Sequence, residues 1–224
     1  MPHQKSKRIL IYFFLLIILG TIHNLFLAKL QIPKIQEIQL VGLNKKELKK
    51  IKKDLSFLKM DSLFYLNALE IEKVLFSYPF VENFTVFKKF PSTLKIEIEK
   101  TQILANKYIK GSNFLIGSNG KLIKSQEKIK NKPSIFGNFR VHEFIQIKNI
   151  IDNSNLAYDE IESFFYFESK RWDIMLKNDI LIKLPQKQID RALELVIDLL
   201  LSKKKENIKI IDARLENQII LNEY

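Results

Sequence analysis

The stretch SYPFVENFTVFKKFPSTLKIEIE, from Ser77 to Glu99, decides the first half of the fold. Its opening residues end a helix, because the proline at position 79 disfavours helical backbone at the residue before it. Residues 80–90 are rich in aromatic and β-branched side chains, which favour a strand, and Pro91 ends it. Residues 94–99 then alternate apolar and polar side chains, as a half-buried strand does. The stretch therefore predicts a hairpin that follows a helix.

Two helices are expected upstream of this hairpin. Asn44 with Glu47 three residues later matches an N-terminal capping pair, and Asn67 with Glu70 repeats it. Each pair precedes apolar residues at helical spacing, which are Leu48, Ile51, Leu55 and Leu58 in the first helix and Ile71, Val74, Leu75 and Tyr78 in the second. Residues 37–40 alternate as a strand does. The predicted order is therefore strand, helix, helix, strand, strand.

The chain beyond Thr101 changes character and predicts a β-rich second domain. Asn119-Gly120 lies between two apolar stretches and predicts a hairpin, because both residues tolerate positive φ. Hydrophobic patterns indicate helices at 141–151 and 189–200, and strands at 164–167, 172–176, 180–184, 208–211 and 218–221.

An apolar run near the N-terminus indicates a membrane anchor. The run from Ile9 to Ala28 carries no Asp, Glu, Lys or Arg, and roughly 20 helical residues span a hydrocarbon core of ~30 Å. A secretory signal peptide has a shorter apolar region and small residues before its cleavage site, so we expect an uncleaved transmembrane helix. Lys5, Lys7 and Arg8 precede the run, which favours a cytoplasmic N-terminus and a translocated remainder.

The predicted fold class is α+β. We expect a cytoplasmic tail at 1–8, a single transmembrane helix at 9–28, a stem at 29–34, a β-α-α-β-β domain at 35–100, and a mixed α/β domain on a largely antiparallel sheet at 101–224. The chain has no Cys, which excludes disulfides, thiol nucleophiles and thiolate metal sites.

The formal net charge of +12 raises the question of a nucleic-acid partner. We expect none, because the basic residues are scattered along the chain and a translocated domain rarely meets nucleic acid. Weak attraction to anionic lipid head groups is left open for the Lys-rich part nearest the membrane.

The sequence contains no recognisable catalytic motif. None of the three His residues, His3, His23 and His142, lies near a plausible nucleophile, and neither a metal-ligand spacing nor a Gly-rich phosphate loop occurs. We expect no catalytic, cofactor or metal site and no small-molecule substrate.

Several motifs together resemble a known family. Residues 77–84 and 89–96 resemble the second half of a POTRA domain, in which an aromatic-flanked Pro-hydrophobe-Val ends the second helix and a Pro-x-Thr-Leu turn joins the hairpin. With the amino-terminal span and the motifs Phe114-Leu115-Ile116, Arg171-Trp172 and Ile211-Asp212-Ala213-Arg214, nearly the whole chain is similar to the FtsQ/DivIB family of bacterial cell-division proteins.

The resemblance implies a noncatalytic divisome scaffold. Such proteins bind other bitopic division proteins of the FtsB and FtsL type outside the cytoplasmic membrane and help to control septal peptidoglycan synthesis. It also implies a single-pass inner-membrane protein at the division septum with periplasmic C-terminal domains, a POTRA domain at 35–100 used in recruitment, and a last strand that contacts FtsB. An alternative that stays open is a membrane-anchored POTRA accessory for protein export or outer-membrane protein assembly.

The candidate partner-binding site is the last strand, because an uncovered edge strand presents unpaired N–H and C=O groups to an extended segment. The predicted contact residues are Arg214, Leu215, Glu216, Asn217, Gln218, Ile219, Ile220 and Leu221. The alternative is an ordinary core strand whose edge is blocked by the last residues of the chain.

Two other groups of residues are candidates for partner binding, each with the alternative that its residues are buried in the core. Arg171 and Trp172 are of types enriched at binding hot spots, although a Trp buried under the amphipathic helix explains the pattern equally. A recruitment patch of Tyr78, Phe80, Val81 and Phe90 is set against the same residues serving as core.

Overall fold

The computed structural model describes residues 3–22, 32–202, 208–216 and 218–223. Helix α1 (His3–Ile22) holds the first part of the predicted span, while 23–28 and the first stem residues, 29–31, lie outside the described residues. Among the helices of the described part of the chain, none combines the length and the apolarity that a membrane crossing requires. The transmembrane helix from Ile9 to Ala28 therefore stays a prediction.

The first domain has the predicted order of strand, helix, helix, strand and strand, but a short 3₁₀ helix is added after the first helix. Leu58 and Tyr78, expected on the first and the second helix, lie outside them. The chain forms β1 (Glu37–Val41), α3 (Lys45–Asp54), the short 3₁₀ helix η1 (Ser56–Met60), α4 (Ala68–Phe76), β2 (Val81–Lys89) and β3 (Thr93–Lys100). The strand order is β1-β3-β2, with β1 parallel and β2 antiparallel to β3. The apolar faces of the helices and strands bury a core that includes Ile51, Leu75 and Ile96.

The helix starts follow from the two Asn residues, with one difference. Asn44 Oδ1 accepts from the N–H of Glu47 at 2.9 Å, and Glu47 Oε2 accepts from the N–H of Asn44 at 3.2 Å, which completes a capping box. Asn67 instead accepts from the N–H of Leu69 at 3.1 Å, and the second half of the predicted Glu70 pair is not formed among the described residues. One capping box and one simple cap result.

The second sheet has nine strands. Its elements are β4 (Ile103–Ile109), β5 (Ser112–Gly117), β6 (Leu122–Ser125), β7 (Ser134–Phe136), α5 (Val141–Asp152), η2 (Tyr158–Glu160), β8 (Ile161–Tyr166), β9 (Trp172–Leu176), β10 (Leu181–Lys183), α6 (Ile189–Leu201), β11 (Ile208–Asp212) and β12 (Ile220–Glu223). The order is β12-β11-β10-β9-β8-β7-β4-β5-β6. Five of the eight pairings are antiparallel and three are parallel, so the sheet is mixed.

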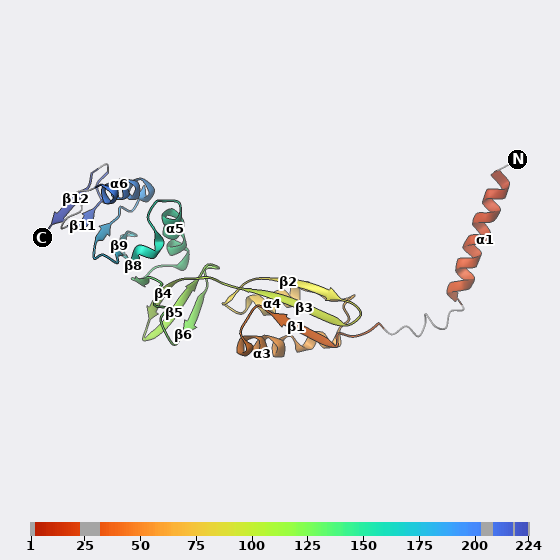
Figure 1. Ribbon diagram of the computed structural model, residues 1–224. Coiled ribbons are helices and arrows are strands. Elements are labelled where there is room, and N and C mark those ends of the chain that lie inside the picture. Colours follow the sequence, from red (N-terminus) through yellow and green to blue (C-terminus); the bar gives the residue numbers. More distant parts are fainter. Residues whose placement is uncertain (1–2, 23–31, 203–207, 217, 224) are drawn as a thin grey trace.

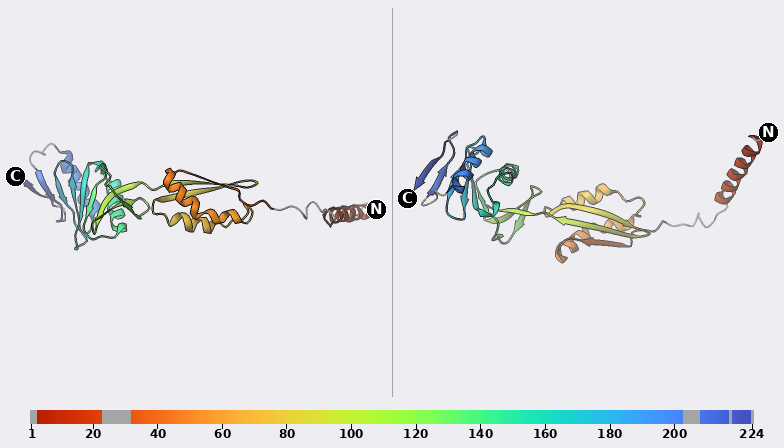
Figure 2. Two further views of the ribbon diagram at one scale, coloured as in Figure 1. Left: turned by 90° about the horizontal axis from the view of Figure 1, so that it is seen from below. Right: turned by 45° about the horizontal axis from the view of Figure 1, so that its top comes forward.

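Helices α5 and α6 lie beside each other against the strands β8 to β11 (Figure 1). Their apolar residues, among them Phe144, Ile147, Leu193 and Val196, are buried in the core of this sheet. The two sheets lie end to end rather than face to face (Figure 2). Each sheet therefore has a core of its own.

Asn119 links the two sheets across their junction. The hairpin between β5 and β6 is present, but of the two turn residues only Gly120 has positive φ, at 73°. The Asn119 side chain instead donates to the carbonyl oxygens of Pro79 and Val81, both at 3.0 Å. Lys121 Nζ donates to the carbonyl oxygen of Phe76 at 2.8 Å. A residue predicted to shape a turn therefore also joins the two domains.

The turn after β1 has no room for a side chain. Gly42 has φ of 103°, and a Cβ atom there would lie 1.8 Å from the carbonyl oxygen of Ile98. We expect Gly42→Ala to lower the free energy of unfolding by more than about 2 kcal/mol, since both strain and overlap oppose it. Thermal unfolding followed by circular dichroism measures the change.

Gly111→Ala is the matched control for this substitution. Gly111 also has positive φ, at 81°, but its nearest neighbour for a Cβ atom is the Tyr108 hydroxyl at 4.0 Å. It should cost only about 1 kcal/mol, the ordinary penalty for an L-residue in this conformation. Equal losses in the two variants would contradict the close approach of Gly42 to β3.

Candidate partner-binding edge

Strand β12 is the outer strand of the nine-stranded sheet. It pairs antiparallel with β11, with Ile220 opposite Asp212 and Leu221 opposite Ile211. Among the described residues no strand pairs with its other side. The outward N–H and C=O groups of this strand are therefore open to an added strand.

The strand begins two residues later than the sequence predicts. Gln218 and Ile219 precede β12, and the N–H of Gln218 donates to the carbonyl oxygen of Leu215 at 3.3 Å. This turn holds the two residues out of the ladder, so the predicted strand at 218–221 is corrected to Ile220–Glu223. Ile219 packs partly against the core, and Asn217 lies outside the described residues.

The edge strand carries exposed apolar side chains. Ile220 is 53% exposed and Leu221 is 39% exposed. Successive side chains of a strand point to opposite faces, so the two residues present apolar surface on both sides of the sheet edge. An uncovered apolar edge is unfavourable for a protein on its own, which makes β12 a strong candidate for partner contact.

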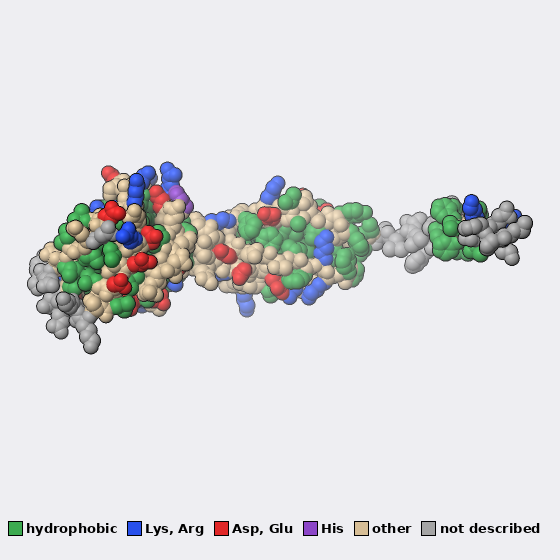
Figure 3. All heavy atoms as spheres, turned by 90° about the horizontal axis from the view of Figure 1, so that it is seen from above, with side chains coloured by type: hydrophobic (Ala, Val, Ile, Leu, Met, Phe, Trp, Pro, Cys, Tyr) green, Lys and Arg blue, Asp and Glu red, His purple; other side chains and the backbone are tan. Residues whose placement is uncertain are grey.

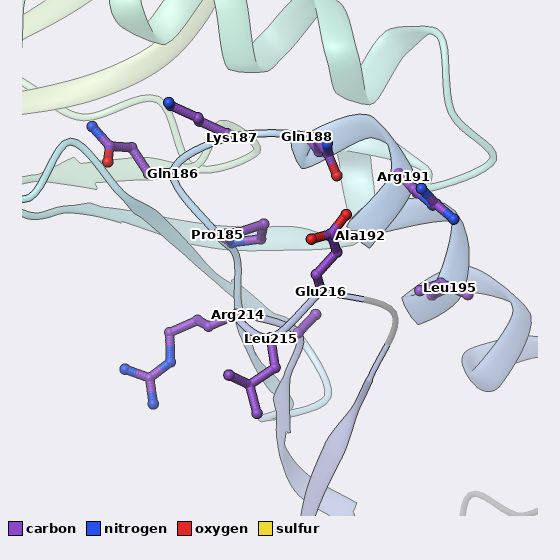
Figure 4. Close-up of a pocket in the computed structure, with 11 residues that line it drawn as sticks. Pro185, Gln186, Lys187, Gln188, Arg191, Ala192, Leu195, Arg214, Leu215 and Glu216 are labelled. Atoms are coloured by element: carbon purple, nitrogen blue, oxygen red, sulfur yellow. The ribbon is translucent and has the colours of Figure 1, made fainter.

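A shallow hollow adjoins this edge between the start of α6 and residues 213–216 (Figure 4). In this view Glu216 points toward the first turn of α6, while Arg214 points away from it. Lys187 and Arg191 also line the hollow and form no ion pair within the described part of the chain. The lining therefore has an excess of positive charge, with three basic residues against one acidic residue.

Arg214 is held by the carboxylate at the end of β11. Its Nε donates to Asp212 Oδ1 at 2.8 Å and to Oδ2 at 2.9 Å. The hydrogen bonds from Arg214 hold the pKa of Asp212 below its usual value and raise the pKa of Arg214. Since Asp212 lies opposite Ile220, this ion pair sits directly beside the edge strand.

A row of charged residues crosses three strands toward the edge. Asp173 of β9 lies opposite Lys183 of β10, and Lys183 lies opposite Asp212 of β11. Arg171 Nε donates to Asp173 Oδ1 at 3.0 Å, so the row begins at Arg171 and ends at Arg214. The structure thus brings two predicted residues, 43 positions apart in sequence, to one end of the sheet. Lys183 could not be predicted from the sequence, because its place in this row depends on the register of the strands.

Trp172 is a core residue. It is 3% exposed, and its ring packs against Tyr166 with centroids 4.7 Å apart and against Phe139 at 5.5 Å. Of the predicted pair, Arg171 alone is accessible; its guanidinium lies 4.4 Å from the ring centroid of Phe167. Trp172 is therefore buried in the core, as the alternative to partner contact predicted.

The residues of the predicted recruitment patch do not form one surface. Tyr78 and Val81 are buried in the first core. The Tyr78 hydroxyl donates to Asp54, and burial together with this carboxylate raises the pKa of Tyr78 to about 12. Phe90 is exposed, but it follows the far end of β2, roughly 30 Å along the strand from Val81. Phe80 is half-buried beside Tyr78.

Comparisons with known proteins identify both domains. Residues 34–100 match the family model described as POTRA domain, FtsQ-type, and residues 107–214 match that of cell division protein FtsQ/DivIB, C-terminal.

Individual relatives carry the same names. Cell division protein FtsQ of Rickettsia bellii (strain RML369-C) is 26% identical over 194 residues, which cover 85% of this chain and 73% of that protein. Cell division protein DivIB of Clostridium botulinum (strain Loch Maree / Type A3) is 30% identical over 162 residues, which cover 70% of this chain and 60% of that protein.

A solved structure, the major extracytoplasmic domain of DivIB from Geobacillus stearothermophilus, covers 46% of this chain and 99% of its own at 12% identity and a TM-score of 0.33. The family assignment comes from the two sequence models, which together match most of the chain. The chain therefore belongs to the FtsQ/DivIB family of cell division proteins.

Proposed function

We propose that this chain is a noncatalytic scaffold of the divisome. In this role it binds FtsB-like and FtsL-like bitopic proteins outside the cytoplasmic membrane and helps to regulate septal peptidoglycan synthesis. Family membership supports a role in cell division. The observation that carries the binding role is the open edge of β12 with its exposed Ile220 and Leu221.

Partner binding at this edge is β-augmentation. An extended segment of the partner adds a tenth strand beside β12, and its backbone satisfies the outward N–H and C=O groups. Each new hydrogen bond contributes about 0.5–1.5 kcal/mol net, and burial of Ile220 and Leu221 adds the apolar part of the binding free energy. Ile220 and Leu221 point to opposite faces, so both faces of the added strand meet apolar surface.

The hollow beside the edge adds a charge requirement. Lys187 and Arg191 have no ion-pair partner in the described part of the chain, whereas Arg214 is already paired with Asp212. An acidic side chain next to the partner's extended apolar segment complements the two free cations and lowers the cost of bringing the surfaces together. We therefore expect a partner segment with at least one Asp or Glu beside its strand.

The proposed location is the cytoplasmic membrane at the division septum, with the N-terminus in the cytoplasm and both domains in the periplasm. Support comes from the uncharged run to Ala28, which continues beyond the last described residue of α1, and from the basic residues that precede it. A recruitment role for the POTRA domain remains part of the proposal. The export or assembly alternative has no support from the domain models, since both are of FtsQ type.

The binding role predicts a large effect of a charge on the edge strand. In the full-length chain, Ile220→Glu should weaken co-purification with FtsB-like and FtsL-like partners by about tenfold or more, because a carboxylate is desolvated next to the added strand. The measurement is the dissociation constant for the purified partners in detergent or nanodiscs. In cells, a fluorescent fusion of the variant should reach the septum but fail to hold the partners there.

The control for this variant is Leu69→Glu. Leu69 is an exposed leucine on α4, in the other domain, so the substitution adds the same charge without touching β12. Its affinity should match that of the unmodified chain. Unchanged affinity of Ile220→Glu, or equal loss in both variants, would contradict binding at the edge.

The charge requirement is tested by reversing the two free cations. Lys187→Glu combined with Arg191→Glu should weaken partner binding by about tenfold at low salt, and the difference should shrink toward 0.5 M salt as screening increases. The control is Lys45→Glu combined with Lys46→Glu, which makes the same change of charge at two exposed lysines of α3. A loss that does not depend on salt would contradict an electrostatic role for the hollow.

A further inference from the structure

An exposed aromatic cluster lies at the end of the first sheet where the chain enters it. Ile32, Pro33, Phe64, Tyr65, Phe90 and Pro91 line an open apolar hollow. Phe64 is 61% exposed and Phe90 is 58% exposed. Hydrophobic side chains gather at this end of the domain in the space-filling view (Figure 3). We call these six residues the aromatic tip.

The aromatic tip is held by three chain segments that meet there. The N–H of Ile35 donates to the carbonyl oxygen of Asp61, and the N–H of Gln36 donates to that of Ser92, both at 2.9 Å. Lys34 also forms an isolated antiparallel bridge with Ser62. The ring centroids of Phe64 and Phe90 lie 5.0 Å apart. These contacts order the exposed rings as one surface, whereas exposed apolar residues usually occur singly.

Basic residues surround the aromatic tip. The segments 32–36, 59–66 and 88–93 contain four exposed lysines, which are Lys34, Lys59, Lys88 and Lys89. Asp61 is their one acidic residue. None of the four lysines forms an ion pair within the described part of the chain. The surface thus combines aromatic rings with uncompensated positive charge.

This combination matches the head-group region of an anionic membrane. Tyr side chains favour the level of the head groups, Phe rings bury at the boundary between head groups and acyl chains, and lysines near such a surface are attracted to anionic lipids. Lysine side chains can also lay their apolar stems along the rings while the ammonium groups reach the phosphates. An apolar protein partner would leave the four cations without a complement.

The chain itself keeps the aromatic tip close to a membrane. Only residues 29–31 separate Ala28, the end of the predicted span, from Ile32, so the two lie no more than about 14 Å apart. We propose that the aromatic tip docks on the head groups of the anionic bilayer that anchors the protein. This inference rests on the membrane anchoring in the proposed function.

Docking would set the distance of the partner-binding edge from the membrane. The second domain follows at the opposite end of the first sheet, and β12 lies at the end of the molecule remote from the aromatic tip (Figure 2). The Asn119 bonds at the junction connect the two parts. A docked tip therefore restrains the domains from tilting freely and presents β12 at a limited distance from the membrane.

The absence of Cys makes a direct test practical. Phe64→Cys in the full-length chain introduces a single thiol, which is labelled with an environment-sensitive fluorophore, and the protein is reconstituted in nanodiscs with or without phosphatidylglycerol. Phe90→Cys gives a second, independent reading. Quenching by a spin-labelled lipid reports contact with the bilayer. No division partner is present, and the scaffold protein of the nanodisc is the same in both lipid mixtures, so a protein partner cannot produce a difference that depends on phosphatidylglycerol.

Tyr108→Cys is the matched control, because Tyr108 is an aromatic residue of β4 with 60% exposure in the second domain. We expect quenching at Phe64 and Phe90 several-fold stronger than at Tyr108. The difference should require phosphatidylglycerol and fall when Lys88→Gln and Lys89→Gln are added. Equal quenching at the tip and at Tyr108 would overturn the docking.

A label at Leu16→Cys separates this inference from the anchoring on which it rests. Leu16 lies in the apolar part of α1, so its label should be quenched strongly in either lipid mixture. Strong quenching at Leu16 without quenching at the tip overturns the docking alone. No quenching at Leu16 overturns the anchoring, and the docking with it.

Discussion

The main-chain hydrogen bonding of the nine-stranded sheet is the constraint on which the rest of the structure depends. Every strand from β11 to β5 has a neighbour on both sides, and the sheet ends at β12 and β6. The crossover through α6 places β11 parallel to β10, and β12 then returns antiparallel on the outside. The buried side chains of Val196, Ile197 and Ile211 hold this crossover in place. The open edge therefore follows from the topology and is supported by the core.

The candidate binding surfaces are positioned by neighbouring residues of the same sheet. Strand register aligns Asp173, Lys183 and Asp212 into a row that ends at Arg214. The turn after Arg214 borders the hollow at the start of α6. At the other end of the sheet, Asn119 spans the junction to the first domain through two carbonyl oxygens. These hydrogen bonds thus connect the first domain to the sheet whose opposite end carries the open edge.

The sequence predicts those parts of the fold that depend on local chemistry. The order of strand, helix, helix, strand and strand in the first domain follows from Asn44, Asn67, Pro79 and Pro91, because caps and breaks act within a few residues. The Asn119-Gly120 hairpin follows for the same reason. The three-residue strand β7 could not be predicted, since it exists through parallel pairing with β4 and β8, which are distant in sequence.

The candidate site was predictable as a region but not residue by residue. The terminal position of the last strand indicates an edge, whereas its start at Ile220 depends on a turn closed by Leu215 and Gln218. Trp172 is buried whereas its neighbour Arg171 is accessible. The sequence does not show this difference, because alternating apolar and polar residues do not tell which strand a helix will cover. Lys187 and Arg191 join the site only when α6 packs beside the last loop.

Addition of a partner strand to β12 is tested by amide hydrogen–deuterium exchange on the full-length chain. Exchange is measured with and without a saturating FtsB-like partner. The amides of β12 should exchange about tenfold more slowly, or slower still, when the partner binds, while those of buried strands such as β9 stay unchanged. Tight binding with unchanged exchange at β12 would contradict strand addition and place the partner elsewhere on the molecule.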